Sequence, residues 1–176
     1  MKHELKEPFT KDKLKALKAG DTVLLTGTIY AARDAAHKKL VEMIERGEDL
    51  PLPIRDQMIY YMGPTPARPG HPIGSAGPTT SYRMDPFTPA LLDFGLSGMI
   101  GKGPRSGEVK AAAAKAGAVY FAAIGGAGAL IAQSIRSSEI VAFAEMGTEA
   151  IWKLHVEDMP LIVAYDPEGG DVYDRG

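Results

Sequence analysis

The chain has 176 residues and a net charge of −2, from 20 Lys and Arg against 22 Asp and Glu. This balance excludes a general attraction to nucleic acid, so an anion site would have to come from a local group of cations. The chain has no cysteine, which excludes a disulfide framework and a cysteine-held zinc or iron–sulfur site built from this chain alone. The length predicts one domain over residues 1–176.

The first residues, M-K-H-E-L-K-E-P, are charged and lack the apolar segment of a signal peptide. No run in the sequence approaches the roughly 20 apolar residues that span a bilayer. Together with the absence of cysteine, these features lead us to expect a cytoplasmic protein.

The N-terminal quarter predicts an arm, a short helix, a strand and a longer helix. Residues 1–10 suit an edge strand or arm, and leucines three residues apart predict a short amphipathic helix over Lys11–Ala19. The apolar run Thr22–Thr28 predicts a buried strand that stops at Gly27. Ala31–Arg46 carries the apolar stripe of a helix.

The turn between this strand and the longer helix is a candidate anion site. A strand, a glycine-containing turn and a helix commonly direct backbone N–H groups toward an anion. Arg33 and His37 lie four residues apart and therefore share a face of the helix, and Asp34 suits its first turn. On sequence alone, Arg33 could equally be a surface arginine.

The segment Gly74–Asp85, G-S-A-G-P-T-T-S-Y-R-M-D, does not resemble an ordinary core element. It follows a predicted strand at Gln57–Met62 and an extended, proline-rich loop. Arg68 and His71 of this loop could lie beside a site, but loop residues of this kind are more often structural. Its glycine and proline break helix and strand, and three hydroxyl side chains follow. Arg83 adds a charged fork suited to a carboxylate or phosphate. The alternative is a turn capped by hydroxyl side chains.

The next part of the chain predicts a helix, a short strand and a second helix. Pro86 suits the first position of the first helix. A short apolar strand then leads into Lys102, which lies between two glycines. Ser106 is expected to cap a helix that runs through Ala116 and stops at Gly117.

The C-terminal part predicts strands around a single helix. A strand at Val119–Ile124 precedes a helix at Ala129–Ile135. Further strands are predicted at Ser138–Phe143, Trp152–Val156 and Leu161–Tyr165. Because helices and strands alternate and strands then cluster, we expect an α/β domain with a layered mixed sheet and flanking helices.

Several familiar catalytic patterns are incomplete. A P-loop fails at Lys102 because the spacing is one residue too long and Gly103 replaces the hydroxyl residue that would hold magnesium. The glycines after the strand at Val119–Ile124 lack the third glycine of a dinucleotide fingerprint, since Ile131 stands there. No G-x-S-x-G elbow occurs, and the four histidines lack metal-ligand spacing.

What remains is a set of cations with neighbouring hydroxyls. Arg33, Arg83 and Lys102 lie at glycine-flanked turns, and Thr79 and Thr80 supply the hydroxyls. Two arginines and a lysine suit a small dianion such as a dicarboxylate. A strong general base and an electrophile are missing, so the sequence predicts half an active site that another chain completes.

Three segments together resemble the β-subunit, or C-terminal domain, of class I iron–sulfur fumarate hydratases. They are G-T-I-Y-A-A-R-D-A-A-H-K (Gly27–Lys38), G-P-T-T-S-Y-R-M-D (Gly77–Asp85) and M-I-G-K-G (Met99–Gly103). Ala123–Ala129 and Glu145–Asp158 are also similar to this family, which includes L(+)-tartrate dehydratase β-subunits. The resemblance covers nearly the whole chain in the right order.

The resemblance implies a swivelling β/β/α domain and a hetero-oligomer, in which β–β contacts could also form. The partner α-subunit would bind an oxygen-sensitive [4Fe-4S] cluster, which agrees with the absence of cysteine here. By the same resemblance, Arg33, Thr79, Arg83 and Lys102 bind a dicarboxylate. Thr79 occupies the position of the group that abstracts a proton, together with an aspartate of the α-subunit.

The implied activity is that of a hydro-lyase of the tricarboxylic acid cycle, which hydrates fumarate to (S)-malate and is inactive without its α-subunit. Dehydration of L-tartrate to oxaloacetate is the alternative within the family, and the residues of this chain do not separate the two. A non-catalytic anion-binding module is a third hypothesis. Retention of the four predicted site residues argues against that module.

Overall fold

The computed structural model describes residues 1–62, 69–70, 77–123 and 128–174. The strands are β1 (Lys2–Lys6), β2 (Thr22–Ala31), β3 (Met58–Tyr60), β4 (Gly98–Gly101), β5 (Val119–Ala123), β6 (Ile135–Ala142) and β7 (Ile151–Tyr165). The helices are α1 (Lys11–Leu14), α2 (Asp34–Glu45), α3 (Thr88–Asp93), α4 (Gly107–Ala116) and α5 (Gly128–Ser134), with short 3-10 helices η1 (Ser81–Met84) and η2 (Ala144–Glu149). Arg68, His71 and the glycine turn at 125–127 lie outside the described residues.

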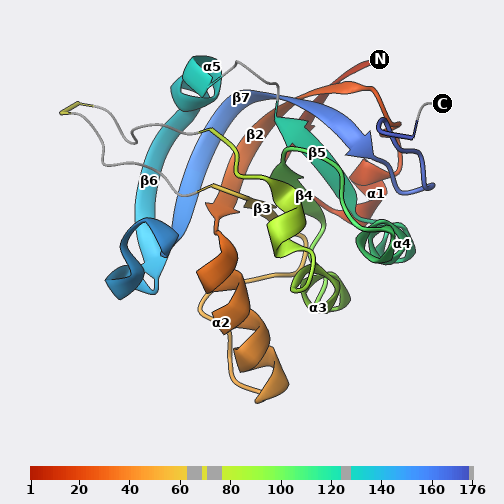
Figure 1. Cartoon of the computed structure of the whole chain (residues 1–176). Coiled ribbons are helices and arrows are strands. Elements are labelled where there is room, and N and C mark those ends of the chain that lie inside the picture. Colours follow the sequence, from red (N-terminus) through yellow and green to blue (C-terminus); the bar gives the residue numbers. More distant parts are fainter. Residues whose placement is uncertain (63–68, 71–76, 124–127, 175–176) are drawn as a thin grey trace.

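Five strands run parallel in the order β1-β2-β3-β4-β5. Parallel neighbours need a crossover connection, and α2, α3 and α4 lie on the connections that follow β2, β3 and β4 (Figure 1). The carboxyl ends of these three strands therefore meet at one edge of the sheet.

The long strand β7 makes the sheet mixed. It pairs antiparallel with β2, with β5 and with β6. Strands β2 and β5 are the two outer strands of the row β2-β3-β4-β5. Because β7 pairs with both of them, these five strands form a closed ring of paired strands. The predicted mixed sheet with flanking helices is confirmed.

Apolar side chains form two buried clusters, on opposite faces of the parallel strands. Successive residues of a strand point to opposite faces. Met58 and Tyr60 accordingly belong to the cluster enclosed by the strands, whereas Ile59 and Tyr61 belong to the cluster that packs against the helices. Leu40 of α2 lies in this second cluster and is fully buried. Strand β3 is thus buried on both faces.

The prediction that the first long strand ends at Gly27 is wrong. Gly27 has a φ of +143° and lies at a register shift after Leu25 in the pairing with β7. A Cβ atom at this position would lie 3.0 Å from the side chain of Glu7. Gly27 is therefore a bulge inside β2. Because β2 continues to Ala31, α2 begins at Asp34, three residues later than predicted.

The C-terminal strands are longer than predicted. The segments Trp152–Val156 and Leu161–Tyr165 belong to one strand, β7. Between them, Asp158 has a φ of 52° and Pro160 cannot donate a backbone hydrogen bond, yet pairing with β2 continues on both sides. Ile135, predicted to end a helix, is the first residue of β6. In this region, pairing with strands distant in sequence decides where the strands begin and end, despite local residues such as Pro160 that usually interrupt a strand.

Two predicted helices differ at their ends. The first, expected to reach Ala19, has the single turn Lys11–Leu14. The second begins at Thr88 and not at Pro86, and Pro89 occupies its first turn. A proline still starts this helix, but it is the second proline of the segment.

Helix α4 has the predicted boundaries. The Ser106 side chain accepts a hydrogen bond of 3.2 Å from the backbone N–H of Val109, and Gly117 ends the helix with a φ of 72°. Both signals are local in sequence, which is why they could be read without the fold.

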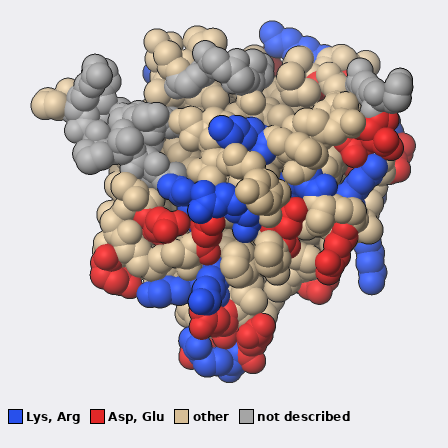
Figure 2. Space-filling model, in the orientation of Figure 1, with Lys and Arg blue, Asp and Glu red and all other residues tan. Residues whose placement is uncertain are grey.

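The surface carries both charges. Figure 2 shows acidic and basic side chains intermixed over the displayed face, in agreement with the small net charge. In the part of the chain that the structure describes, no helix combines the length and the apolar character needed to cross a membrane.

Candidate anion-binding site

The predicted site residues lie where the parallel strands end. Strand β2 leads through Ala32 to Arg33, β3 precedes the segment that contains Thr79, and β4 leads directly into Lys102 (Figure 1). In open sheets with parallel strands, ligands bind beyond the carboxyl ends of the strands. The fold thus brings the three sequence segments that we grouped to the edge where a ligand is expected.

An ion pair joins the η1 segment to helix α2. Nε of Arg83 lies 2.9 Å from Oδ2 of Asp34, the first residue of α2. The Arg83 side chain is 46% exposed, so the guanidinium is held at Nε while it remains accessible. Arg33 is the N-cap residue of the same helix and is half-buried. Two arginines therefore flank a helix N-terminus, where the backbone N–H groups also favour an anion.

Backbone hydrogen bonds hold the hydroxyl-rich segment against β3 and β4. The N–H of Thr79 donates to the carbonyl of Tyr61 at 2.7 Å. The N–H of Ser81 donates to the carbonyl of Lys102 at 3.0 Å, and the N–H of Lys102 donates back to Oγ of Ser81 at 3.0 Å. Thr80 and Lys102 form a parallel bridge. Both threonines are half-buried, and the lysine beside them is exposed.

Hydrogen bonds of the buried Tyr120 support the junction at which Ser81 and Lys102 bond to each other. Oη of Tyr120 lies 2.6 Å from Oγ of Ser81 and 2.7 Å from the carbonyl oxygen of Gly103. The carbonyl can only accept, so the tyrosine donates to it and the serine hydroxyl donates to the tyrosine. The Ser81 oxygen remains the acceptor for the N–H of Lys102. Each proton in these hydrogen bonds has one acceptor, which fixes the orientation of both segments.

Three buried polar atoms at the start of α2 have no hydrogen-bond partner among the described residues: Nε of Arg33, Oδ1 of Asp34 and Nε2 of His37. Nδ1 of His37 lies 2.8 Å from the carbonyl oxygen of Arg33, so this nitrogen carries the proton and Nε2 is the acceptor. Burial lowers the pKa of His37 to about 4, so the ring is neutral at neutral pH. Unpaired buried polar groups are uncommon, and they mark where a ligand or ordered water would complete the hydrogen bonding.

The structure also identifies a buried arginine that the sequence analysis did not single out. The side chain of Arg105 is fully buried, and its Nε lies 2.6 Å from Oδ1 of Asp85. Its Nη2 donates to the hydroxyls of Tyr61 at 3.1 Å and Thr88 at 2.8 Å. The available signal was that this arginine follows Lys102 by three residues, in a segment already under consideration. Its partners come from other segments, so the sequence alone gave no reason to bury it.

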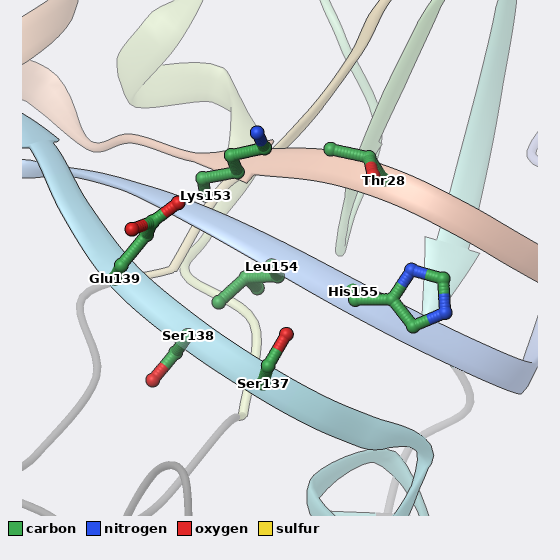
Figure 3. Close-up of a pocket in the computed structure, with 7 residues that line it drawn as sticks. All are labelled: Thr28, Ser137, Ser138, Glu139, Lys153, Leu154 and His155. Carbon is green, nitrogen blue, oxygen red and sulfur yellow. The ribbon is translucent and has the colours of Figure 1, made fainter.

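The described part of the chain offers no set of ligands for a metal cluster. It has no cysteine, and among the residues that the structure describes no group of three or more His, Asp or Glu could hold a metal ion. A hollow of about 290 Å³ lies elsewhere, over β2, β6 and β7 (Figure 3). Thr28, Ser137 and His155 line it, and none of the predicted site residues does.

The fold and the site define an α/β protein that presents cations and hydroxyls at the carboxyl edge of parallel strands, as expected for an anionic ligand. The chain belongs to the fumarase C-terminus family, whose model matches residues 1–176. The resemblance inferred from the sequence motifs is thereby confirmed.

Curated relatives fall into two groups by length. The anaerobic class I fumarate hydratase of Escherichia coli K12 is 47% identical over 153 residues, which are 86% of this chain and 28% of that protein. Fumarate hydratase 2 of Leishmania major is 40% identical over 99% of this chain and 32% of its own length. The chain therefore spans about a third or less of these enzymes. A putative L(+)-tartrate dehydratase subunit beta of Methanocaldococcus jannaschii is 40% identical, and the match covers 95% of this chain and 89% of that protein.

Proposed function

We propose that this chain is the β-subunit of a two-subunit class I fumarate hydratase, which interconverts fumarate and (S)-malate by reversible hydration. The observation that carries the proposal is the convergence of Arg33, Arg83, Thr79 and Lys102 at one edge of the sheet. A dicarboxylate presents two anionic groups, and three cations on separate segments can bind both of them.

The partner that we propose is an α-subunit that binds a [4Fe-4S] cluster. Two observations support it: this chain lacks cysteine, and it covers only 28% and 32% of the length of the two long fumarate hydratases, so most of each lies outside the match. We further propose that residues 1–176 form one swivelling-type domain of a cytoplasmic hetero-oligomer that is inactive without the α-subunit.

The residues of this chain can bind, orient and stabilise charge. We assign Arg33, Arg83 and Lys102 to the two substrate carboxylates. When the proton on the carbon next to a carboxylate leaves, negative charge accumulates on that carboxylate, and fixed cations stabilise it. Thr79 faces the proton to be removed in this proposal. A threonine hydroxyl is a weak base, so it requires a neighbouring carboxylate, which we assign to the α-subunit.

The second candidate is dehydration of L-tartrate to oxaloacetate. The observation that favours it is the similarity to a putative tartrate dehydratase β-subunit of nearly the same length. Both reactions remove or add water across two carbons of a four-carbon dicarboxylate. The same cations serve either substrate, so the choice rests on which substrate the assembled enzyme turns over.

The test is reconstitution. The chain is mixed anaerobically with the cluster-bearing α-subunit, and the loss or gain of fumarate absorbance is followed with malate or fumarate as substrate. A parallel assay measures oxaloacetate formed from L-tartrate. We expect activity from the mixture and none from either chain alone. A mixture that is inactive on all three substrates would contradict both candidate functions.

A further inference from the structure

Arg105 and Asp85 form a buried ion pair next to the candidate site. Within the described part of the chain, their hydrogen bonds do not include the side chains of Arg83 or Lys102. Besides its bonds to Asp85, Tyr61 and Thr88, the guanidinium of Arg105 lies over the rings of Tyr61 and Tyr120, at 5.0 and 4.9 Å from their centroids. Its position is therefore fixed from several directions, through hydrogen bonds at Nε and Nη2 and through both aromatic rings.

The same pair connects the two segments that carry exposed cations. Asp85 follows Arg83 by two residues, and Arg105 follows Lys102 by three. One carboxylate oxygen of Asp85 lies 2.6 Å from Nε of Arg105, and the other accepts the N–H of Ser106 at 2.8 Å. A single carboxylate thus holds two successive residues of the Lys102 segment against the Arg83 segment.

Stability alone does not explain this arrangement. Removing two charges from water has a desolvation penalty of several kcal/mol per ion, which mutual attraction often fails to exceed, so a buried ion pair adds little to stability over a packed apolar pair. A buried and fully hydrogen-bonded pair does, however, permit only one geometry. The Asp85 side chain is 13% exposed and that of Arg105 is 0% exposed. Because the surrounding protein encloses both side chains, neither can easily move to another position.

We infer that Arg105 and Asp85 are positioning residues that set the spacing of Arg83 and Lys102 for the two carboxylates of the substrate. The inference rests on the proposed function for its consequence in catalysis. The mechanical link itself, between the Arg105–Asp85 pair and the Ser81–Lys102 junction, stands on the contacts within this chain.

The first arm of the test is kinetic and uses the reconstituted complex. Arg105→Lys keeps the charge but cannot reach Asp85, Tyr61 and Thr88 together, and Asp85→Asn removes the charge with little change in shape. We expect either variant to raise KM for the dicarboxylate about tenfold or more, since small misplacements of binding groups have large kinetic effects. A role in stability alone would lower the active fraction, and hence kcat, with KM unchanged.

The matched control is Glu157→Gln, which breaks the exposed pair between Glu157 and Arg136 at 3.4 Å. It should leave both kinetic constants as in the wild type. An unchanged KM in both Arg105→Lys and Asp85→Asn would overturn the positioning role. Should Arg105→Lys fail to fold, Asp85→Asn decides the question.

The second arm does not depend on activity. Hydrogen–deuterium exchange is followed at the amides of Ser81 and Lys102, which bond to each other's residues across the junction. We expect at least tenfold faster exchange in Asp85→Asn and no change in Glu157→Gln. Unchanged exchange would overturn the link. A wild-type complex inactive on fumarate and L-tartrate, with faster exchange in Asp85→Asn, would overturn the proposed function and keep the link.

Discussion

Arg83 is the residue at which the η1 segment meets helix α2. Its bond to Asp34 orients the guanidinium, and nearly half of the side chain stays exposed. We expect Arg83→Ala to lower kcat/KM of the reconstituted enzyme by about 10²–10³-fold, the loss typical of removing one charge-stabilising group from an active site. Because an exposed ion pair contributes at most about 1 kcal/mol, the free energy of unfolding should barely change. Steady-state kinetics and urea unfolding measure the two quantities.

Arg136→Ala serves as the control for loss of a positive charge. Arg136 is 58% exposed and pairs with Glu157, so it resembles Arg83 in exposure and partner type. Activity should remain at the wild-type level in this variant. A mild effect of Arg83→Ala, similar to that of the control, would mean that the motif around Arg83 does not bind substrate.

His37 is a buried neutral histidine whose protonation opposes folding. Its folded-state pKa of about 4 lies below the ordinary value of 6.5 because burial disfavours the charged ring. Between these values the unfolded chain binds a proton that the folded chain does not, so stability is complete above pH 6.5 and falls as the pH approaches 4. The shift corresponds to about 3 kcal/mol over this window.

Urea unfolding of wild type and His37→Asn at pH 7.5 and pH 4.5 measures this contribution. Asparagine keeps a donor for the carbonyl of Arg33 but does not titrate. Between pH 7.5 and pH 4.5 the wild type should lose more stability than the variant. We expect the difference to be most of the roughly 3 kcal/mol that corresponds to the pKa shift of His37. The carboxyl of Asp21, whose pKa of about 2 is lowered mainly by the N–H of Lys18, titrates below this window and is common to both chains. Equal losses in both chains would contradict the assignment.

Residue type and local motif led us to group Arg33, Thr79, Arg83 and Lys102 as a candidate site, and this assignment stays a prediction. Arg105 could not be predicted in the same way, because its burial depends on Asp85, Tyr61 and Thr88, which come from three other places in the chain. A lone arginine in a Gly-Pro-Arg-Ser segment looks like a surface residue until its partners are known.

At the scale of elements, Gly101 sets how closely the hydroxyl-rich segment can approach β4. A Cβ atom on Gly101 would overlap with Oγ of Ser81 and lie 2.8 Å from the ring of Tyr61. We expect Gly101→Ala to lower the free energy of unfolding by about 1–3 kcal/mol, because overpacking forces the neighbours to move. Thermal or urea unfolding of the isolated chain provides the measurement.

Gly107→Ala is the matched control. Gly107 is the first residue of α4, and nothing lies within 4 Å of a Cβ atom added there. This substitution should change stability by less than about 0.5 kcal/mol, as expected for an exposed position. Equal effects of the two substitutions would show that the contact with Ser81 does not limit the packing of this element.

Elements with local end signals were predicted well, and elements defined by distant partners were not. Ser106 and Gly117 mark both ends of α4 because a cap is a property of adjacent residues. By contrast, β2 passes through Gly27 and β7 passes through Pro160 because each pairs with the other across more than a hundred residues of sequence. Alternation and turn residues do not reveal such pairing.

At the scale of the whole molecule, the site faces outward. Arg83 and Lys102 are exposed, and the described residues supply no cluster ligands. The sequence predicted such an incomplete site from the residue types alone, since cations and hydroxyls were present without a strong base or an electrophile. If the proposed α-subunit completes the site, we expect it to dock beyond the carboxyl ends of β2, β3 and β4, where the exposed cations lie.

Tyr82 lies on that side and is the feature that we expect a partner to cover. It stands between Thr79 and Arg83 in sequence, and 63% of its surface is exposed. Tyrosine is enriched among the residues that dominate protein–protein binding. Phe94 is also exposed, at 46%, but it precedes β4 and therefore lies near the opposite edge of the sheet.

The test titrates this chain into the α-subunit and measures the concentration of this chain that gives half-maximal activity. We expect Tyr82→Ala to raise that concentration about tenfold or more. The reason is that truncating an interface anchor typically costs about 1–2 kcal/mol or more. Phe94→Ala should leave that concentration unchanged. At saturating concentrations of this chain, KM for the substrate should match the wild type if Tyr82 binds the partner and not the substrate. A raised KM with an unchanged titration midpoint would instead place Tyr82 against the substrate, and the partner would then have to dock through other exposed residues around the same edge.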